Sequence, residues 1–184
     1  MAAENSMIPP LEDGVDHVRG PVGTRAIVEY GDYECPYSRQ AYREIQRVEA
    51  QLSEGVRFAF RHFPLTEIHP HALAASSAAE AAALQDRFWD MHDLLLDHQG
   101  ALTLRDVIGY ARSLGLDMDK FSTDLRKHAG AARIAEDVGS ADLSGVSGTP
   151  TFFVNGTRHY GAYDVESLSR AVKLALARTK ISAA

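Results

Sequence analysis

The sequence predicts an α/β fold in which a block of helices interrupts a central mixed β-sheet. Three observations indicate this fold class. A strand, a helix and a second strand follow one another within residues 24–63, strand signals return only at residues 149–161, and the stretch between them, residues 67–143, is helical in pattern. The predicted element order is therefore β-α-β, a helical insertion, and then β-β-α.

The first β-α-β unit begins with the run TRAIVEYG (24–31), whose β-branched residues and final glycine are typical of a strand. Pro36 favours the first turn of a helix, where its missing N–H costs nothing. Gly55 ends that helix, and VRFAFRHF (56–63) follows as a second strand. The helix has apolar residues at three- and four-residue spacing: Ala41, Ile45, Val48 and Leu52. On the second strand, Val56, Phe58 and Phe60 share one face.

The remaining elements follow the same kind of pattern. Within residues 67–143, alanine-rich and amphipathic stretches predict several helices, and Phe88 and Trp89 are interpreted as core residues. The segment TPTFFVNGTRHYG (149–161) contains an Asn-Gly pair between two apolar runs, which is the strongest local signal for a hairpin. A closing amphipathic helix follows, with Asp164 or Ser167 as its cap. Its expected core residues are Val165, Leu168, Val172, Leu174 and Leu176.

The composition limits domain organisation and partners. The chain has 184 residues, is 45% apolar and carries a formal charge of −6, so neither a basic nucleic-acid surface nor a membrane-spanning segment is expected. Residues 1–20 are expected to form a flexible N-terminal arm, 21–66 and 144–184 one domain, and 67–143 a helical insertion within it. No secretory signal is recognisable, which predicts a cytoplasmic location, or a periplasmic one if a signal has been removed.

Cys35 is the only cysteine, so any disulfide chemistry involves a partner molecule. Its predicted position, where a strand ends and a helix begins, favours negative charge because unpaired N–H groups and the helix dipole meet there. Cysteines at helix N-termini are often held as reactive thiolates. Arg39 and Arg43 would add positive potential, whereas Asp32 and Glu34 would oppose it. The alternative interpretation is a buried, inert cysteine.

Four segments in this order resemble the thioredoxin superfamily, and more closely its DsbA-like branch, over residues 21–184. They are VEYGDYECPYS (28–38), RHFPL (61–65), the helical insertion, and GTPTFFVNG (148–156). The resemblance implies a thioredoxin-like fold and thiol–disulfide oxidoreductase activity without a cofactor. It implies a nucleophilic cysteine, a cis-proline loop that docks the substrate, a buried acidic residue beneath the thiol, and contact residues at the site mouth. Cys35 matches the nucleophile, Thr149 and Pro150 match the docking loop, and Tyr37 matches a contact residue at the mouth of the site. Pro36 follows the cysteine in the motif and opens the helix. Glu29 matches the buried acidic residue, and the alternative for it is an exposed carboxylate on the strand.

Ser38 departs from the family pattern because relatives have a second cysteine there. A serine does not resolve a mixed disulfide from within, although its hydroxyl is able to donate a hydrogen bond to the Cys35 thiolate. Single-thiol chemistry is therefore expected, in which an external thiol of the glutathione type resolves mixed disulfides with substrate proteins. That chemistry suits reduction, isomerisation or deglutathionylation. The sequence leaves open whether Ser38 replaces a natural cysteine.

Two other functions remain open from the sequence. One is a redox-inactive module that uses the cis-proline edge to bind a peptide or protein, and the other is a peroxide sensor in which Cys35 forms a sulfenic acid. No metal site is expected. His62, His69 and His71 lie close together in the sequence, but they lack a third ligand at a fixed spacing and are interpreted as surface or capping residues.

Overall fold

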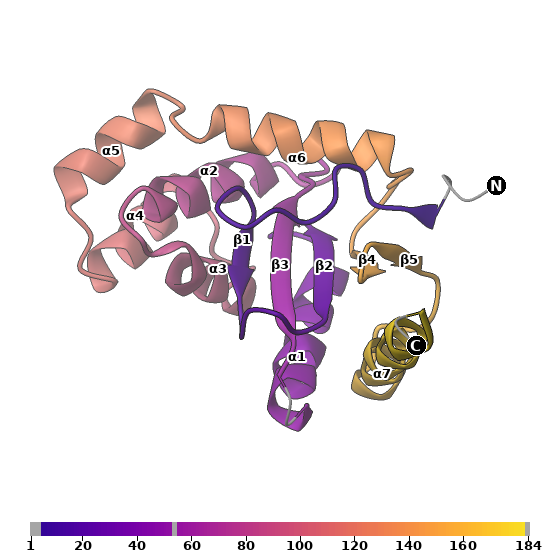
Figure 1. Ribbon diagram of the computed structural model, residues 1–184. Coiled ribbons are helices and arrows are strands. Elements are labelled where there is room, and N and C mark those ends of the chain that lie inside the picture. The colour runs from indigo at the N-terminus through magenta and orange to yellow at the C-terminus, as the bar shows by residue number, and fades with distance from the viewer. Residues whose placement is uncertain (1–4, 53–54, 183–184) are drawn as a thin grey trace.

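A five-stranded sheet in the order β1-β3-β2-β4-β5 forms the centre of the molecule (Figure 1). The computed structural model describes residues 5–52 and 55–182, with side chains described up to residue 175. Strands β2 and β3 are parallel, and the other neighbouring pairs are antiparallel. The strands are β1 (His17–Arg19), β2 (Ala26–Gly31), β3 (Arg57–His62), β4 (Thr151–Val154) and β5 (Thr157–His159). The predicted α/β class and element order are confirmed, and β1 is added at the N-terminal side.

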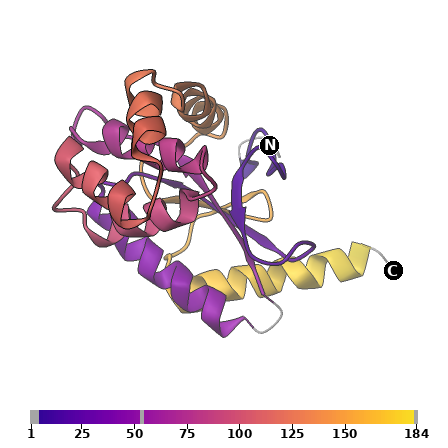
Figure 2. The same ribbon diagram turned by 90° about the vertical axis from the view of Figure 1, so that its left-hand side faces the viewer.

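Seven helices of the described chain surround this sheet. Helices α1 and α7 pack against each other on one face, and α6 packs against β3 on the other (Figures 1 and 2). Helices α2 to α5 gather at the β1 side, so the predicted helical insertion extends the fold in that direction (Figure 1). The helices are α1 (Pro36–Gln51), α2 (Ala72–Ala83), α3 (Phe88–Asp97), α4 (Leu104–Ser113), α5 (Met118–Arg126), α6 (Ala131–Leu143) and α7 (Val165–Ser182).

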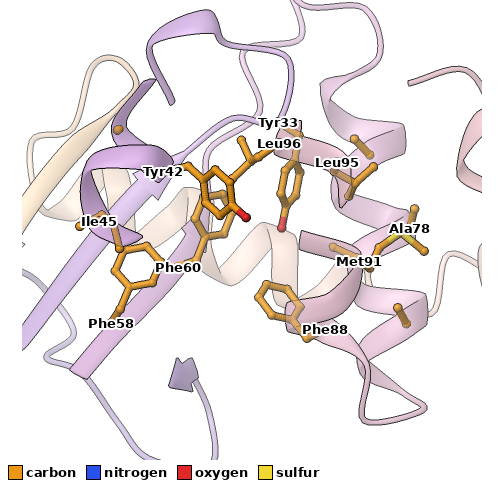
Figure 3. Close-up of a cluster of buried hydrophobic side chains, with 14 of the residues drawn as sticks. Tyr33, Tyr42, Ile45, Phe58, Phe60, Ala78, Phe88, Met91, Leu95 and Leu96 are labelled. Atoms are coloured by element: carbon orange, nitrogen blue, oxygen red, sulfur yellow. The ribbon is translucent and has the colours of Figure 1, made fainter. Parts of the chain in front are cut away.

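The larger hydrophobic core joins one face of the sheet to the helical insertion. Side chains from β3, α1, α2 and α3 meet there, and Figure 3 shows Phe58 and Phe60 lying close to Tyr42 and Ile45. Phe88 is buried in this core and Trp89 packs against it, as the helical spacing predicts. Because α1 is anchored by its buried apolar stripe, its N-terminus is held at a fixed place beside the sheet.

The described part of the N-terminal segment, residues 5–20, packs against the sheet, whereas a flexible arm was expected over residues 1–20. Of its described part, Met7 is buried, and the Arg61 guanidinium donates to the carbonyl oxygens of Pro9 and Pro10 at 3.1 and 3.2 Å. Strand β1 pairs with β3. The sequence pattern missed this docking because the segment is polar and proline-rich, and it is held by bonds to residues far along the chain.

The C-terminal elements agree with the sequence pattern except at one residue. Asn155 and Gly156 have φ angles of +52° and +77° between β4 and β5, as the predicted Asn-Gly turn requires. Asp164 accepts a hydrogen bond from the Ser167 N–H at 2.9 Å, which caps α7. Of the expected core residues, Leu168 and Val172 are buried and Val165 packs against the core, whereas Leu174 is 59% exposed because it lies on the solvent side of α7. Leu176 lies beyond the described side chains.

Within the described chain, none of the helices combines the length and apolar character that crossing a bilayer requires.

Candidate active site

Cys35 lies in the loop that connects β2 to α1. Strand β2 ends at Gly31, where a Cβ atom would come within 2.3 Å of the Phe60 ring, so only glycine fits beneath that ring. The chain then turns, and the Cys35 N–H donates to the Asp32 carbonyl oxygen at 3.1 Å. Pro36 is the first residue of α1. Cys35 therefore occupies the N-cap position of α1, directly before its first helical residue.

The sulfur of Cys35 faces the loop that precedes β4. Cys35 Sγ donates to the Thr149 carbonyl oxygen at 3.4 Å, and the Thr149–Pro150 peptide bond is cis. Antiparallel pairing between β2 and β4 brings the two loops together. Cys35 is only 3% exposed, and the Thr149 hydroxyl is buried without a hydrogen-bond partner. The structure therefore brings together the predicted nucleophile and the predicted docking loop, with the thiol covered by that loop.

The backbone around Cys35 is held by a residue that the sequence analysis missed. The Gln99 side-chain amide donates to the carbonyl oxygens of Tyr33 and Cys35, both at 2.8 Å. The Cys35 carbonyl also accepts the first helical bond of α1, from the Arg39 N–H at 3.2 Å. The Cys35 side chain makes no capping bond to the first turn. Gln99 lies in the loop after α3, where no sequence pattern marks it.

Ser38 is fully buried, and its hydroxyl group is hydrogen-bonded to the backbone. Its Oγ accepts a hydrogen bond from the Asp32 N–H at 3.2 Å, while the Cys35 thiol bonds to Thr149 instead. The serine thus stabilises the loop that leads into the cysteine. The hydrogen bond from Ser38 to Cys35 that the sequence analysis considered is not among the contacts of these two side chains in the structure.

The acidic residues beside Cys35 are occupied by other partners. The Asp32 carboxylate is buried and accepts from the backbone N–H groups of Glu34 and Leu65, both at 2.8 Å, and His69 Nδ1 lies 2.8 Å away. His71 Nδ1 lies 2.9 Å from Glu34. These contacts fold the 64–71 loop against the active-site loop. His69 and His71 therefore pair with carboxylates, which the sequence analysis did not predict, and the His71 side chain makes no capping bond although the residue precedes α2.

Arg39 and Arg43, which the sequence analysis expected to add positive potential, are not hydrogen-bond partners of the Cys35 sulfur. The Arg39 guanidinium donates to the Asp97 carbonyl oxygen at 3.1 Å, and Arg43 is exposed.

Glu29 lies on β2 between Phe60 of β3 and Phe152 of β4. It is 1% exposed, and both of its carboxylate oxygens lack hydrogen-bond partners. Burial raises the pKa of Glu29 from 4.5 to about 8, although the positive charge of Arg19 opposes this. The carboxyl group is therefore neutral at pH 7 and able to take part in proton transfer near that pH.

Two tyrosines stand at the mouth of the site. Tyr37, in the first turn of α1, is 62% exposed. Tyr163, before α7, donates to Gln40 at 3.3 Å, and burial together with the nearby negative charges of Cys35, Tyr37 and Glu29 raises the pKa of its hydroxyl. Tyr163 thus lies close to both the thiol and the buried acid. The sequence analysis missed it because it precedes a helix and belongs to no motif.

A cysteine at a helix N-terminus, facing a cis-proline loop on a mixed sheet with a helical insertion, is the arrangement of DsbA-like thiol–disulfide oxidoreductases. The family model described as Thioredoxin matches residues 13–174, and the chain belongs to this family.

Several solved structures have this fold. A thioredoxin-like oxidoreductase from Silicibacter pomeroyi is 31% identical, with a TM-score of 0.78 over 89% of this chain and 93% of that one. Oxidised BdbD from Bacillus subtilis is 20% identical, with a TM-score of 0.78 over 92% of this chain and 97% of BdbD. The catalytic domain of Proteus mirabilis ScsC is 22% identical, with a TM-score of 0.74 over 90% of this chain and 92% of that domain.

The curated relatives that match are longer proteins named as antiporters. The chain is 53% identical over 173 residues to a Na+/H+ antiporter NhaA 1 of Salinispora arenicola, a match that covers 94% of this chain and 26% of the relative. It is 41% identical over 170 residues to the Na+/H+ antiporter NhaA 1 of Mycolicibacterium gilvum, a match that covers 91% of this chain and 28% of the relative. The chain thus spans about a quarter of the length of these relatives.

Proposed function

We propose that this chain catalyses thiol–disulfide exchange through Cys35 as its only nucleophile. The observation that carries the proposal is the 3.4 Å contact between Cys35 Sγ and the carbonyl oxygen of Thr149, the residue that precedes cis-Pro150. The helix N-terminus favours the thiolate, and the adjacent loop offers a backbone edge for a partner chain.

The proposed reaction has two exchange steps. The Cys35 thiolate attacks one sulfur of a substrate disulfide, which breaks the S–S bond, forms a mixed disulfide with Cys35 and releases the other sulfur as a thiolate that takes up a proton. A second thiol then attacks the mixed disulfide, becomes joined to the substrate sulfur and restores the Cys35 thiolate. Across the cycle Cys35 is neither oxidised nor reduced, and the external thiol supplies the reducing equivalents.

The proposed roles of the surrounding residues follow from their positions. Thr149 and Pro150 align the partner chain, and displacement of the Thr149 carbonyl from Cys35 Sγ uncovers the thiol. Glu29, which is neutral at pH 7, gives its proton to the thiolate released in the first step and recovers one from the thiol that attacks in the second. Tyr37 contacts the partner at the mouth of the site.

Ser38 determines which thiol completes the reaction. Because its hydroxyl is buried and is no nucleophile toward disulfides, the mixed disulfide waits for a thiol from solution, of the glutathione type, or for a second cysteine of the substrate. Single-thiol exchange suits reduction, isomerisation and deglutathionylation.

The test is an assay of glutathione-dependent reduction of a mixed disulfide between glutathione and a small thiol. Wild type is expected to accelerate the reaction and Cys35→Ala to abolish the acceleration. Ser38→Ala is the matched control, because it changes the same turn of α1 but keeps the thiol, and it should stay active. Equal rates for wild type and Cys35→Ala would overturn the proposal.

A second candidate function is a redox-inactive module that binds a peptide along the Thr149–Pro150 loop. The 3% exposure of Cys35 favours it, because a nucleophile must be reached by its target. The rate at which iodoacetamide alkylates Cys35 near pH 7 distinguishes thiol–disulfide exchange from peptide binding alone. A rate above that of the unfolded chain supports exchange, whereas a rate far below it, unchanged by added disulfide peptide, supports binding alone.

A further inference from the structure

Three potential metal ligands from separate elements converge in a cluster that does not include Cys35. They are His17 on β1, His62 at the end of β3, and Glu80 on α2. One ligand atom from each lies within 4.8 Å of the others. His62 is fully buried at the end of β3, which fits packing at a strand end, the usual role of a histidine in that position. No sequence pattern marks the cluster, because its members are far apart in the chain.

Both imidazole rings direct the same nitrogen at one carboxylate oxygen. His17 Nε2 lies 2.6 Å from Glu80 Oε1, and His62 Nε2 lies 2.8 Å from that atom. Ligands around a tetrahedral ion with bonds near 2.0–2.1 Å are about 3.3 Å apart, so each of the two nitrogens needs to move away from Glu80 Oε1 by less than about 1 Å to admit an ion.

The packing around the cluster fixes the orientation of each ligand. The His17 ring stacks on Phe88 with centroids 3.5 Å apart and planes 8° apart, and the His62 ring lies edge-on to Phe60 at 5.6 Å. The stem of Glu80 is pressed against Gly130, where a Cβ atom would come within 2.2 Å of Glu80 Cβ. Because the side chains are already held in place, binding an ion costs little ordering.

The cluster also offers suitable charge and access. One carboxylate and two neutral imidazoles balance half the charge of a divalent ion. Buried Asp137, which accepts the backbone N–H of His62 at 2.9 Å, is a second carboxylate nearby, and its other oxygen pairs with Arg133. The His17 side chain is 18% exposed, whereas that of Glu80 is 8% exposed, so entry is from the β1 side.

We propose that His17, His62 and Glu80 bind one divalent transition-metal ion, with its remaining coordination position open to water. Two imidazoles and a carboxylate suit Zn2+, Co2+, Ni2+ or Cu2+ rather than Mg2+ or Ca2+, which prefer sets of oxygen ligands. The site is separate from the proposed exchange reaction and does not depend on it.

The experiment is a titration of the full chain carrying Cys35→Ser, which removes the thiol as a competing ligand, with Co2+ followed by visible absorption. One equivalent is expected to bind saturably and to be displaced by Zn2+, which binds more tightly in general. His17→Gln should weaken binding by more than about 10-fold, since even outer-shell changes have effects of that size. Glu80→Gln, which keeps the side-chain volume, should weaken it similarly.

The matched control is His71→Gln. His71 also pairs with a glutamate, Glu34, at 2.9 Å, but no second histidine joins that pair, so its loss should leave Co2+ binding unchanged. Absence of saturable Co2+ binding to folded Cys35→Ser protein, or binding that persists undiminished in both His17→Gln and Glu80→Gln, would overturn the proposal.

Discussion

The thiol of Cys35 donates to the carbonyl oxygen of Thr149 at 3.4 Å, although 114 positions separate the two residues in the sequence. The antiparallel pairing of β2 with β4 produces this contact, since each residue lies in the loop beside one of these strands. The contact joins the proposed nucleophile to the backbone edge at which we propose that a partner chain docks. Any partner that pairs with Thr149 competes with the thiol for the same carbonyl.

Restoring a second thiol should change the products of oxidation. In wild type, a mild oxidant such as glutathione disulfide is expected to leave Cys35 in a mixed disulfide, because no other cysteine exists in the chain. In Ser38→Cys, the new thiol attacks that mixed disulfide and closes an internal bond. Mass spectrometry after oxidation should therefore show an added glutathione on wild type and none on Ser38→Cys. A glutathione adduct that persists on Ser38→Cys would contradict this expectation.

Replacement of Glu29 should change how stability depends on pH. Burial raises the pKa of Glu29 from 4.5 to about 8, so between these values the folded chain holds a proton that the unfolded chain has lost. The stability contributed by this group is complete below pH 4.5 and is lost as pH rises through about 8. We expect the free energy of unfolding of wild type to fall by about 3–5 kcal/mol relative to Glu29→Gln over this range.

Urea unfolding of both proteins at several pH values between 4.5 and 9 measures this difference. Glu29→Gln should be the more stable protein at the alkaline end, because it has no carboxylate to ionise in the apolar interior. Parallel stability curves for the two proteins would contradict a strongly raised pKa at Glu29.

Gln99 is expected to hold the active-site loop in place. Its amide bonds the carbonyl oxygens of Tyr33 and Cys35, so Gln99→Ala should reduce the free energy of unfolding by about 1–3 kcal/mol and accelerate alkylation of the covered thiol. Gln99→Glu, which keeps the shape but turns a carboxylate oxygen toward these two carbonyls, should have the larger effect. Alkylation rates equal to wild type in both variants would show that Gln99 does not hold this loop.

The ion pair between Arg61 and Asp16 should contribute strongly to holding the N-terminal segment. Arg61 donates to both Asp16 carboxylate oxygens, at 2.7 and 2.9 Å, and is 2% exposed. Asp16→Ala leaves a buried guanidinium without its counter-charge and should cost about 3–5 kcal/mol in urea unfolding. As a control, Asp90→Ala removes an exposed pair with Arg87 at 2.6 Å and should cost less than about 1 kcal/mol. Similar losses in the two variants would contradict the role of the buried pair.

The sequence allowed prediction of elements whose pattern is local. The apolar spacing in α1, the helical insertion and the Asn155-Gly156 turn depend on residues close together in the chain, and each appears in the structure. Strand β1 was missed because its three residues pair only with β3, more than thirty residues later. Leu174 was assigned to the core because hydrophobicity does not distinguish the two sides of a partly covered helix.

The residues of the candidate site also fall into two groups, those that a local motif marks and those that only packing between distant segments brings to the site. Cys35, Ser38 and Pro150 belong to motifs, so they could be singled out from the sequence. The burial of Cys35 under Thr149 and the support from Gln99 could not, because both arise from packing between distant segments. The proposed catalytic and docking roles remain predictions that the assays above address.

The docking of the N-terminal segment has a consequence for self-association. Ser6 forms a β-bridge with Thr157 of β5, and β1 covers the long strand β3, so one stretch of chain reaches both borders of the sheet. Without it, the six residues of β3 would present unpaired backbone groups on which another molecule's strand could assemble. Residues 6–19 are therefore expected to hinder the addition of a strand from another molecule at both borders of the sheet.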